Sequence, residues 1–231
     1  MKRFYREVTS APVGAAWQVR LDGRGLKTVG GRPQLLPSAA LAEALAAEWA
    51  AQGEEIDPTA FVLRDMADYA LDVVAPDPAA ARAALLPYGE TDTLCYRADP
   101  DEPLYRRQLD EWEPLLGQAE ADWALRFTRV SGIIHRAQPA ETLAGLERRM
   151  TMLDAFALAS LRNLASLSAS LVIGLLALAP GADIARLWQA ASLEEEWQAD
   201  LWGRDWEAEE RRARRTAAFA AAARFAQLAA S

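Results

Sequence analysis

Two prolines in three residues, Pro76 and Pro78, interrupt the chain early in its length. Proline lacks a backbone N–H and fixes its own φ angle, so neither a helix nor a strand continues easily through such a segment. The segment before the prolines combines short apolar runs, turns and helical runs, whereas nearly all of the sequence after them is predicted to be helical. We therefore predict two domains, residues 1–78 and 79–231, in a chain of the α+β class.

The first domain is predicted to contain a small β-sheet followed by helices. Asp22-Gly23 is typical of a hairpin turn, because Gly readily adopts a positive φ angle. Ser38 is placed to cap a helix that starts at Ala39 and ends at Gln52, before Gly53. The predicted strands are Phe4–Val8, Trp17–Leu21, Leu26–Val29 and Gln34–Leu36, and a second helical segment is expected from Asp57-Pro58 to Val74.

The second, larger domain is predicted to be all-helical. Its most apolar run, Leu164–Pro180, is interrupted by serines and is shorter than the roughly 20 residues that a membrane span requires, so it is interpreted as a buried core helix. Phe127–Ile134 is ambiguous and also fits a short extended segment. The predicted helices are Ala79–Tyr88, Leu104–Trp123, Glu141–Leu161, Asn163–Ala179, Asp183–Ala191, Ser192–Trp202 and Glu207–Ala230.

Composition limits the chemistry that this chain supports. It has one cysteine, Cys95, and one histidine, His135, which excludes an intrachain disulfide framework, a Cys/His zinc site and a paired-cysteine redox site. The formal net charge of −8 argues against general binding to nucleic acid. The N-terminus lacks the apolar stretch of a signal peptide, so we expect a cytoplasmic protein with no membrane insertion.

Two groups of residues remain as candidates for catalysis or metal binding. Cys95 and His135 could form a nucleophile and its base only if they are in contact and a third group orients the base, and structural roles are commoner. Asp65, Asp68 and Asp72 follow i, i+3, i+7 spacing and share a helix face. Three carboxylates could hold a divalent cation, but a solvated helix face is the more frequent arrangement.

The most informative segment carries acidic and aromatic side chains together. Residues 194–210 contain eight carboxylates and one basic residue, Arg204, and four arginines follow directly. On a helix, Leu193, Trp197 and Leu201 would share one face and pack inward, whereas Glu195, Gln198 and Trp202 would share another. The second face suits a protein-binding surface, because Trp anchors many interfaces. The alternative is that Trp202 and Trp206 wedge between neighbouring helices, and both interpretations remain open.

The sequence resembles the family of assembly chaperones for the alpha subunit of the F-type ATP synthase catalytic head, which occurs in mitochondria and alphaproteobacteria. Six segments carry the resemblance, in order and over nearly the whole chain. They are KRFY (Lys2–Tyr5), LDGRGLKT (Leu21–Thr28), LPSAALAEALAAEWAAQGEEIDP (Leu36–Pro58), ETDTLCYRAD (Glu90–Asp99), RQLDEWEPLL (Arg107–Leu116) and LEEEWQADLWGRDWEA (Leu193–Ala208).

This resemblance implies a chaperone that does not use ATP and is not an enzyme. It would bind the unassembled alpha subunit and shield the surface that the beta subunit later covers. It also implies an N-terminal domain of mixed sheet and helix and a helical C-terminal domain. The residues that it implies for contact with the client are Glu195, Gln198, Trp202 and Asp205. We expect a monomer with no cofactor and no metal.

Two other functional hypotheses stay open at the level of sequence. A small-ligand-binding protein or enzyme could use a cleft between the two domains, with Asp65, Asp68, Cys95 and His135 as its candidate residues. A structural subunit that stays in its final complex is also compatible with the sequence.

Overall fold

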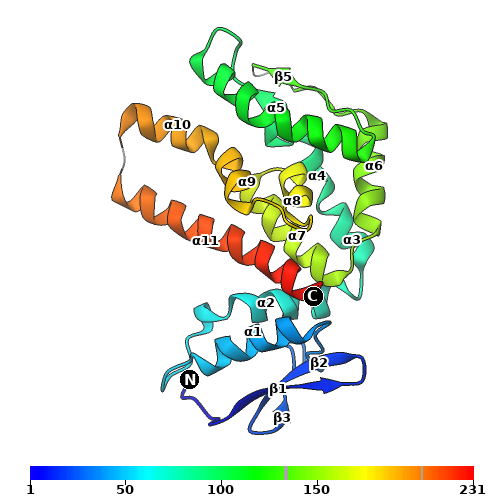
Figure 1. The fold of residues 1–231 in the computed structure, drawn as a ribbon, viewed down its shortest axis with the longest axis vertical. Coiled ribbons are helices and arrows are strands. Elements are labelled where there is room, and N and C mark those ends of the chain that lie inside the picture. The colour runs from blue at the N-terminus through cyan, green and yellow to red at the C-terminus, as the bar shows by residue number, and fades with distance from the viewer. Residues whose placement is uncertain (133–134, 204) are drawn as a thin grey trace. The chain divides into compact units, whose positions relative to one another are not determined.

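The computed structural model describes residues 1–132, 135–203 and 205–231. Two compact units are distinguished by their internal contacts. Unit 1 contains Met1–Ala81 and two later segments, Leu153–Ser160 and Arg224–Ser231; unit 2 contains Arg82–Met152 and Leu161–Ala223. The α+β class is confirmed, with a small sheet near the N-terminus and a mostly helical remainder (Figure 1). The domain boundary at residue 78 stays a prediction.

The sheet of unit 1 is an antiparallel meander. The strands β1 (Val8–Val13), β2 (Ala16–Leu21) and β3 (Arg24–Gly25) lie in that order. The predicted turn at Asp22-Gly23 is confirmed, with φ angles of 49° and 78°. These left-handed angles match the twist of a two-residue hairpin.

The first strand begins later than predicted. Phe4–Val8 was expected to be extended and paired, but β1 starts at Val8. The Asp22 carboxylate accepts hydrogen bonds from the backbone N–H groups of Arg6 and Glu7, at 3.0 and 2.8 Å. The Asp22 side chain, and not a neighbouring strand, is thus the hydrogen-bond partner of these two N–H groups. Two further predicted strands, Leu26–Val29 and Gln34–Leu36, are likewise absent. Each segment makes isolated β-bridges instead of a continuous ladder, between Lys27 and Pro33 and between Trp17 and Leu36.

Helix α1 (Ala39–Ala50) packs on β1 and β2 (Figure 1). Its start agrees with the prediction, because the Ser38 hydroxyl accepts the Leu41 N–H at 3.0 Å. Its predicted end at Gln52 is two residues too late. A 3-10 turn (Pro58–Ala60), α2 (Val62–Tyr69) and a π-helical segment (Ala70–Val74) complete the N-terminal part of the unit.

The predicted helices of the remainder are broken more often than expected. One helix was predicted over Asn163–Ala179, but α7 ends at Ser168, Ala169 has a φ angle of 49°, and α8 begins at Leu171. Glu141–Leu161 divides between α6 and α7, and Ala79–Tyr88 between α3 and α4. The bounds are α3 Pro78–Ala83, α4 Leu86–Glu90, a 3-10 turn Thr93–Cys95, α5 Pro103–Trp123, α6 Ala140–Thr151, α7 Ala155–Ser168, α8 Leu171–Ala177, α9 Ile184–Ala191, α10 Leu193–Trp202 and α11 Trp206–Ala229.

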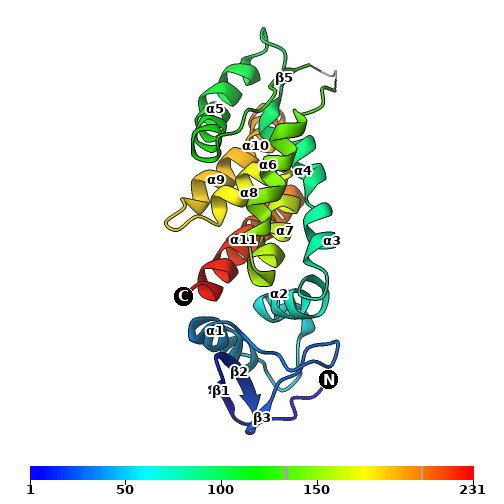
Figure 2. The same ribbon diagram turned by 90° about the vertical axis from the view of Figure 1, so that its right-hand side faces the viewer.

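The core of unit 2 is built around α8. Every residue of α8 is buried, and it contacts α4, α5 and α9 (Figure 2). The prediction that the apolar run Leu164–Pro180 is a buried core helix is therefore confirmed for Leu171–Ala177. No helix in the described ranges is long and apolar enough to cross a membrane.

Unit 2 is not all-helical, which corrects the prediction. The strands β4 (Tyr96–Arg97) and β5 (Val130–Ser131) form a short parallel pair. The sequence left Phe127–Ile134 ambiguous, and the structure shows a strand at Val130–Ser131; positions 133 and 134 lie outside the described residues.

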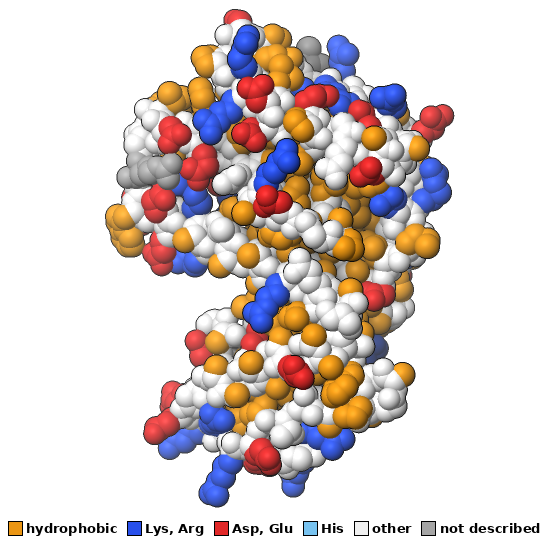
Figure 3. Space-filling model, viewed as in Figure 1, with side chains coloured by type: hydrophobic (Ala, Val, Ile, Leu, Met, Phe, Trp, Pro, Cys, Tyr) orange, Lys and Arg blue, Asp and Glu red, His pale blue; other side chains and the backbone are white. Residues whose placement is uncertain are grey.

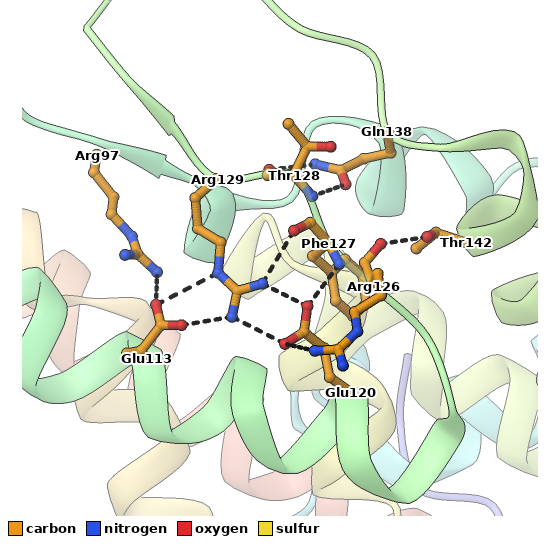
Figure 4. A network of polar contacts seen from close by, with 9 residues as sticks. All are labelled: Arg97, Glu113, Glu120, Arg126, Phe127, Thr128, Arg129, Gln138 and Thr142. Carbon is orange, nitrogen blue, oxygen red and sulfur yellow. Dashed lines mark hydrogen bonds and ion pairs between the residues drawn. The ribbon is translucent and has the colours of Figure 1, made fainter.

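An ion-pair network holds the extended segment before β5 against α5 (Figure 4). The Arg129 guanidinium lies 2.6 Å from Glu113 Oε1 and 2.5 Å from Glu120 Oε1, and Arg97 also binds Glu113. Burial opposes ionisation of both glutamates, but the hydrogen bonds from the arginines outweigh it and lower the pKa of Glu113 and Glu120. Glu113 and Glu120 both lie on α5, and both bind the Arg129 guanidinium.

One buried carboxylate links the 3-10 turn to the core helix. Asp92 is fully buried and accepts the backbone N–H groups of Leu94, at 3.1 Å, and Val172, at 2.9 Å. Burial raises the pKa of Asp92 from 3.8 to about 6, despite these hydrogen bonds to the charged form. The folded state therefore retains a proton that the unfolded state loses between those two pH values.

We expect Asp92 to make the protein less stable as the pH rises from about 4 to about 7. A raised folded-state pKa contributes stability that is present at low pH and is lost as the pH rises through about 6. Relative to Asp92→Asn, the free energy of unfolding of the wild type should fall by about 3 kcal/mol over this range. Urea denaturation at several pH values measures it, and a difference that does not vary with pH would contradict the assignment.

Candidate functional site

The acidic segment forms a helical hairpin of α10 and α11 (Figure 1). The predicted helix Ser192–Trp202 and its end at Gly203 agree with the structure, in which Gly203 has a φ angle of 94°. Asp205 accepts the Glu207 N–H at 3.3 Å and so caps α11, which begins at Trp206, one residue before the prediction. Arg204, which belongs to the acidic segment, lies outside the described residues.

Charged side chains attach α10 to α11. Glu195 binds Arg215, and Glu196 Oε1 lies 3.0 Å from Arg212 Nε. Arg215 also donates to the Leu167 carbonyl at 2.9 Å and lies 5.5 Å from the ring centre of Trp188. These contacts position α10 without burying it.

The start of α10 is also fixed by α5. Gln108 Nε2 donates to Glu194 Oε1 at 2.7 Å, and the indole N–H of Trp112 donates to the Ala190 carbonyl at 2.8 Å, just before α10. Of the ten described residues of α10, Leu193 alone is buried. The helix is thus anchored at its first turn and extends outward from there.

The hairpin end exposes large apolar side chains. Trp202 is 81% exposed, Trp206 71% and Leu201 61%. The prediction that Leu201 packs inward is therefore wrong, and so is the alternative that the two tryptophans wedge between helices. Trp197 is half-buried and Leu193 is buried, so the predicted inward face holds for the first two turns of α10. Figure 3 shows acidic and hydrophobic side chains gathered at this end.

The four expected client-contact residues line one cleft. Glu195, Gln198, Trp202 and Asp205 face a hollow of about 390 Å³ between α10 and α11. The opposite wall carries Arg211, Arg212 and Arg215. The structure thus brings the four together, and their contact with a client stays a prediction.

Sequence reasoning missed the residue that organises this site. Arg215 lies twenty positions after Glu195, so helical spacing gives no signal for their pairing. The i, i+4 pairs that spacing does predict, Glu207 with Arg211 and Glu210 with Arg214, are on the exposed surface of α11 at 3.9 and 2.8 Å.

Cys95 and His135 do not have the features of a catalytic pair. Cys95 is fully buried, and burial raises the pKa of its thiol, which keeps it protonated near neutral pH. The His135 ring is exposed, and its Nδ1 lies 2.9 Å from the Tyr96 hydroxyl oxygen, with which it shares a hydrogen bond.

Two of the three aspartates on α2 and the π-helical segment organise a loop in unit 1. Asp68 accepts the Val29 N–H at 3.2 Å and the Gln34 amide at 2.6 Å, and Asp72 accepts the Thr28 hydroxyl and the Gly30 N–H, at 2.7 and 2.8 Å. A solvated face is therefore wrong for these two, and Asp65 pairs with Arg64. Within the described part of the chain, no three His, Cys, Asp or Glu side chains are grouped to hold a metal ion.

Comparison with known proteins gives consistent similarities. A family model described as ATP12 chaperone protein matches residues 2–120. The crystal structure of Atp12 from Paracoccus denitrificans is 38% identical and covers 99% of this chain and 98% of its own, with a TM-score of 0.92. An Asp→Lys mutant of the same protein gives the same identity and TM-score. Atu1473 from Agrobacterium tumefaciens is 36% identical, with a TM-score of 0.94, and the match covers 100% of this chain and 86% of that one.

We expect Arg215→Ala to destabilise the protein by about 1–2 kcal/mol, because it removes the Glu195 ion pair, the hydrogen bond to Leu167 and the contact with Trp188. The matched control is Arg214→Ala, whose exposed pair with Glu210 contributes about 0.3–0.5 kcal/mol. Urea denaturation compares the two, and equal losses would show that Arg215 does not organise the hairpin.

Proposed function

The chain belongs to the ATP12 chaperone family, and from this premise we propose that it binds the unassembled alpha subunit of the F-type ATP synthase catalytic head. On this proposal it shields the surface that the beta subunit later covers, and it does so in the cytoplasm without using ATP. The family membership supports a chaperone role in ATP synthase assembly and a protein that is not an enzyme. The client and the surface that contacts it are the parts that we propose.

The exposed tryptophans at the hairpin end carry this proposal. Burial of the apolar surface of an indole ring is favourable, so a ring that stays in water leaves this stabilisation unused. Large exposed apolar side chains on a folded protein therefore often mark an interaction site. Trp202 and Trp206 are exposed although the helices that carry them are well attached at their bases. Covering both rings would supply the apolar centre of an interface, with acidic groups at its rim.

Shape at this site supports the binding of a protein segment. The cleft between α10 and α11 is open, and one wall is acidic while the other carries arginines. Glu195 is already bound to Arg215, so Gln198, Trp202 and Asp205 are better placed than Glu195 to contact a client directly. We assign Glu195 a positioning role through Arg215.

The alternative of a small enzyme or ligand-binding protein gains no support from two of its four candidate residues, Cys95 and Asp68. The Cys95 thiol is buried and protonated, and the Asp68 carboxylate is occupied by Val29 and Gln34. Neither group is available to act on a ligand in this arrangement.

We expect Trp202→Ala to weaken binding of the isolated alpha subunit by about tenfold or more, because a central aromatic anchor contributes at least 1–2 kcal/mol to an interface. The melting temperature should not change, since the ring is 81% exposed. The matched control is Met152→Ala, which truncates a side chain that is 85% exposed on another part of the chain. Biolayer interferometry measures both, and native affinity of the Trp202 variant would rule out this surface.

The association rate with the alpha subunit should fall as salt rises, by about tenfold from low to high ionic strength. The excess of carboxylates in residues 194–210 would attract a basic client surface over distances that salt screens. The dissociation rate should change less, because buried apolar contacts determine it. Stopped-flow measurements test this, and an association rate that does not depend on salt would exclude steering by the hairpin charges.

A further inference from the structure

Unit 1 carries a groove that the proposed function does not use. It has a volume of about 480 Å³ and is lined by the N-terminal segment on one side and by the start of β3 and the loop after it on the other. We call this the basic groove, and its residues are Phe4, Asp22, Arg24, Gly25, Leu26 and Lys27.

The basic groove combines an apolar ring with positive charge. Phe4 is 63% exposed and is held in place by an edge-to-face contact with Tyr5, with the ring centres 5.3 Å apart. Arg24 and Lys27 are exposed at its edge. The surrounding sequence is basic as well, since residues 1–32 contain seven basic and two acidic side chains.

The groove contains one carboxylate, Asp22, and two cations, Arg24 and Lys27. The Asp22 carboxylate is occupied by the backbone N–H groups of Arg6 and Glu7. These hydrogen bonds, together with the nearby Arg6 and Arg24 charges, lower the pKa of Asp22, so its carboxylate stays ionised and the groove keeps an excess of positive charge from Arg24 and Lys27. The groove therefore fits a partner that brings carboxylates and a large apolar side chain.

This chain carries a segment of that chemistry on unit 2. We define the acidic tip as Asp200, Leu201, Trp202, Asp205, Trp206 and Glu207, at the hairpin end. Its apolar side chains are among the most exposed in the described structure, and Arg212 and Arg215 are bound to Glu196 and Glu195 farther from the turn. The tip and the groove are thus complementary in both charge and apolar character.

We propose that the acidic tip of one copy docks in the basic groove of a second copy. The two patches are different surfaces, so each contact joins the tip of one copy to the groove of another. A contact that depends on exposed charges of opposite sign is weakened by salt. The monomer expected from the sequence is then the dilute or high-salt state. The docked copy would cover the exposed Trp202 ring.

A reciprocal charge exchange in the full-length chain tests the proposal. The first variant, Arg24→Glu with Lys27→Glu, makes the groove acidic. The second, Asp200→Lys with Glu207→Lys, leaves Asp205 as the one carboxylate of the acidic tip and makes the tip basic. Sedimentation velocity of each protein alone and of their mixture, over a range of concentrations and at low and high salt, gives the association constants. Thermal melts of all proteins check that they remain folded.

The wild type should associate with rising concentration at low salt and dissociate at high salt. Each variant alone should associate at least tenfold more weakly, because its groove and its tip then have the same sign of charge. The mixture should recover most of the wild-type association, since each groove now meets a tip of opposite charge. A loss of folding in either variant could not produce that recovery.

The matched control exchanges charge elsewhere on unit 2. Arg148→Glu, on the exposed surface of α6, should leave the association constant unchanged. A wild type that stays monomeric at every concentration, or a mixture that does not recover, overturns the proposal. Because no alpha subunit is present in this experiment, its result is independent of the proposed client.

Discussion

The ion pairs between Arg215 and Glu195 and between Arg212 and Glu196 determine what the C-terminal hairpin can present to other molecules. Two helices are usually held together by apolar side chains, which are then hidden from any partner. Here charged groups hold α10 against α11, and Leu193 is the buried anchor. Trp202 and Trp206 remain outside the helix contact, where they are available for another protein.

Carboxylates have a second role throughout the structure, as acceptors for backbone N–H groups. Asp22 binds Arg6 and Glu7, Asp92 binds Leu94 and Val172, and Glu48 accepts the N–H groups that begin α2. Part of the acidic composition is therefore structural and is not available for binding. Burial also hides some of these carboxylates from a partner: Asp92 is fully buried, whereas Asp22 is exposed and keeps its charge at the surface.

Local signals in the sequence were sufficient for some turns and helix ends, and insufficient for contacts between distant segments. Asp22-Gly23, the Ser38 cap and the end of α10 at Gly203 depend on one to four neighbouring residues, and all three agree with the structure. The start of β1 could not be predicted, because a carboxylate fifteen or sixteen positions away binds the N–H groups before it. The left-handed Ala169, which separates α7 from α8, has no residue type that signals it. The structure places the four client-contact candidates in one cleft. The role of Arg215 could not be predicted, because its pairing with Glu195 depends on tertiary structure.

The small anchor of α10 has a consequence for how this protein changes over evolutionary time. Most core positions are constrained by many neighbours, so a substitution there must be accommodated by all of them. On α10, most side chains meet solvent, so a substitution there costs little folding stability. Substitutions at these positions are therefore expected to change what the helix presents to other molecules more than they change the fold.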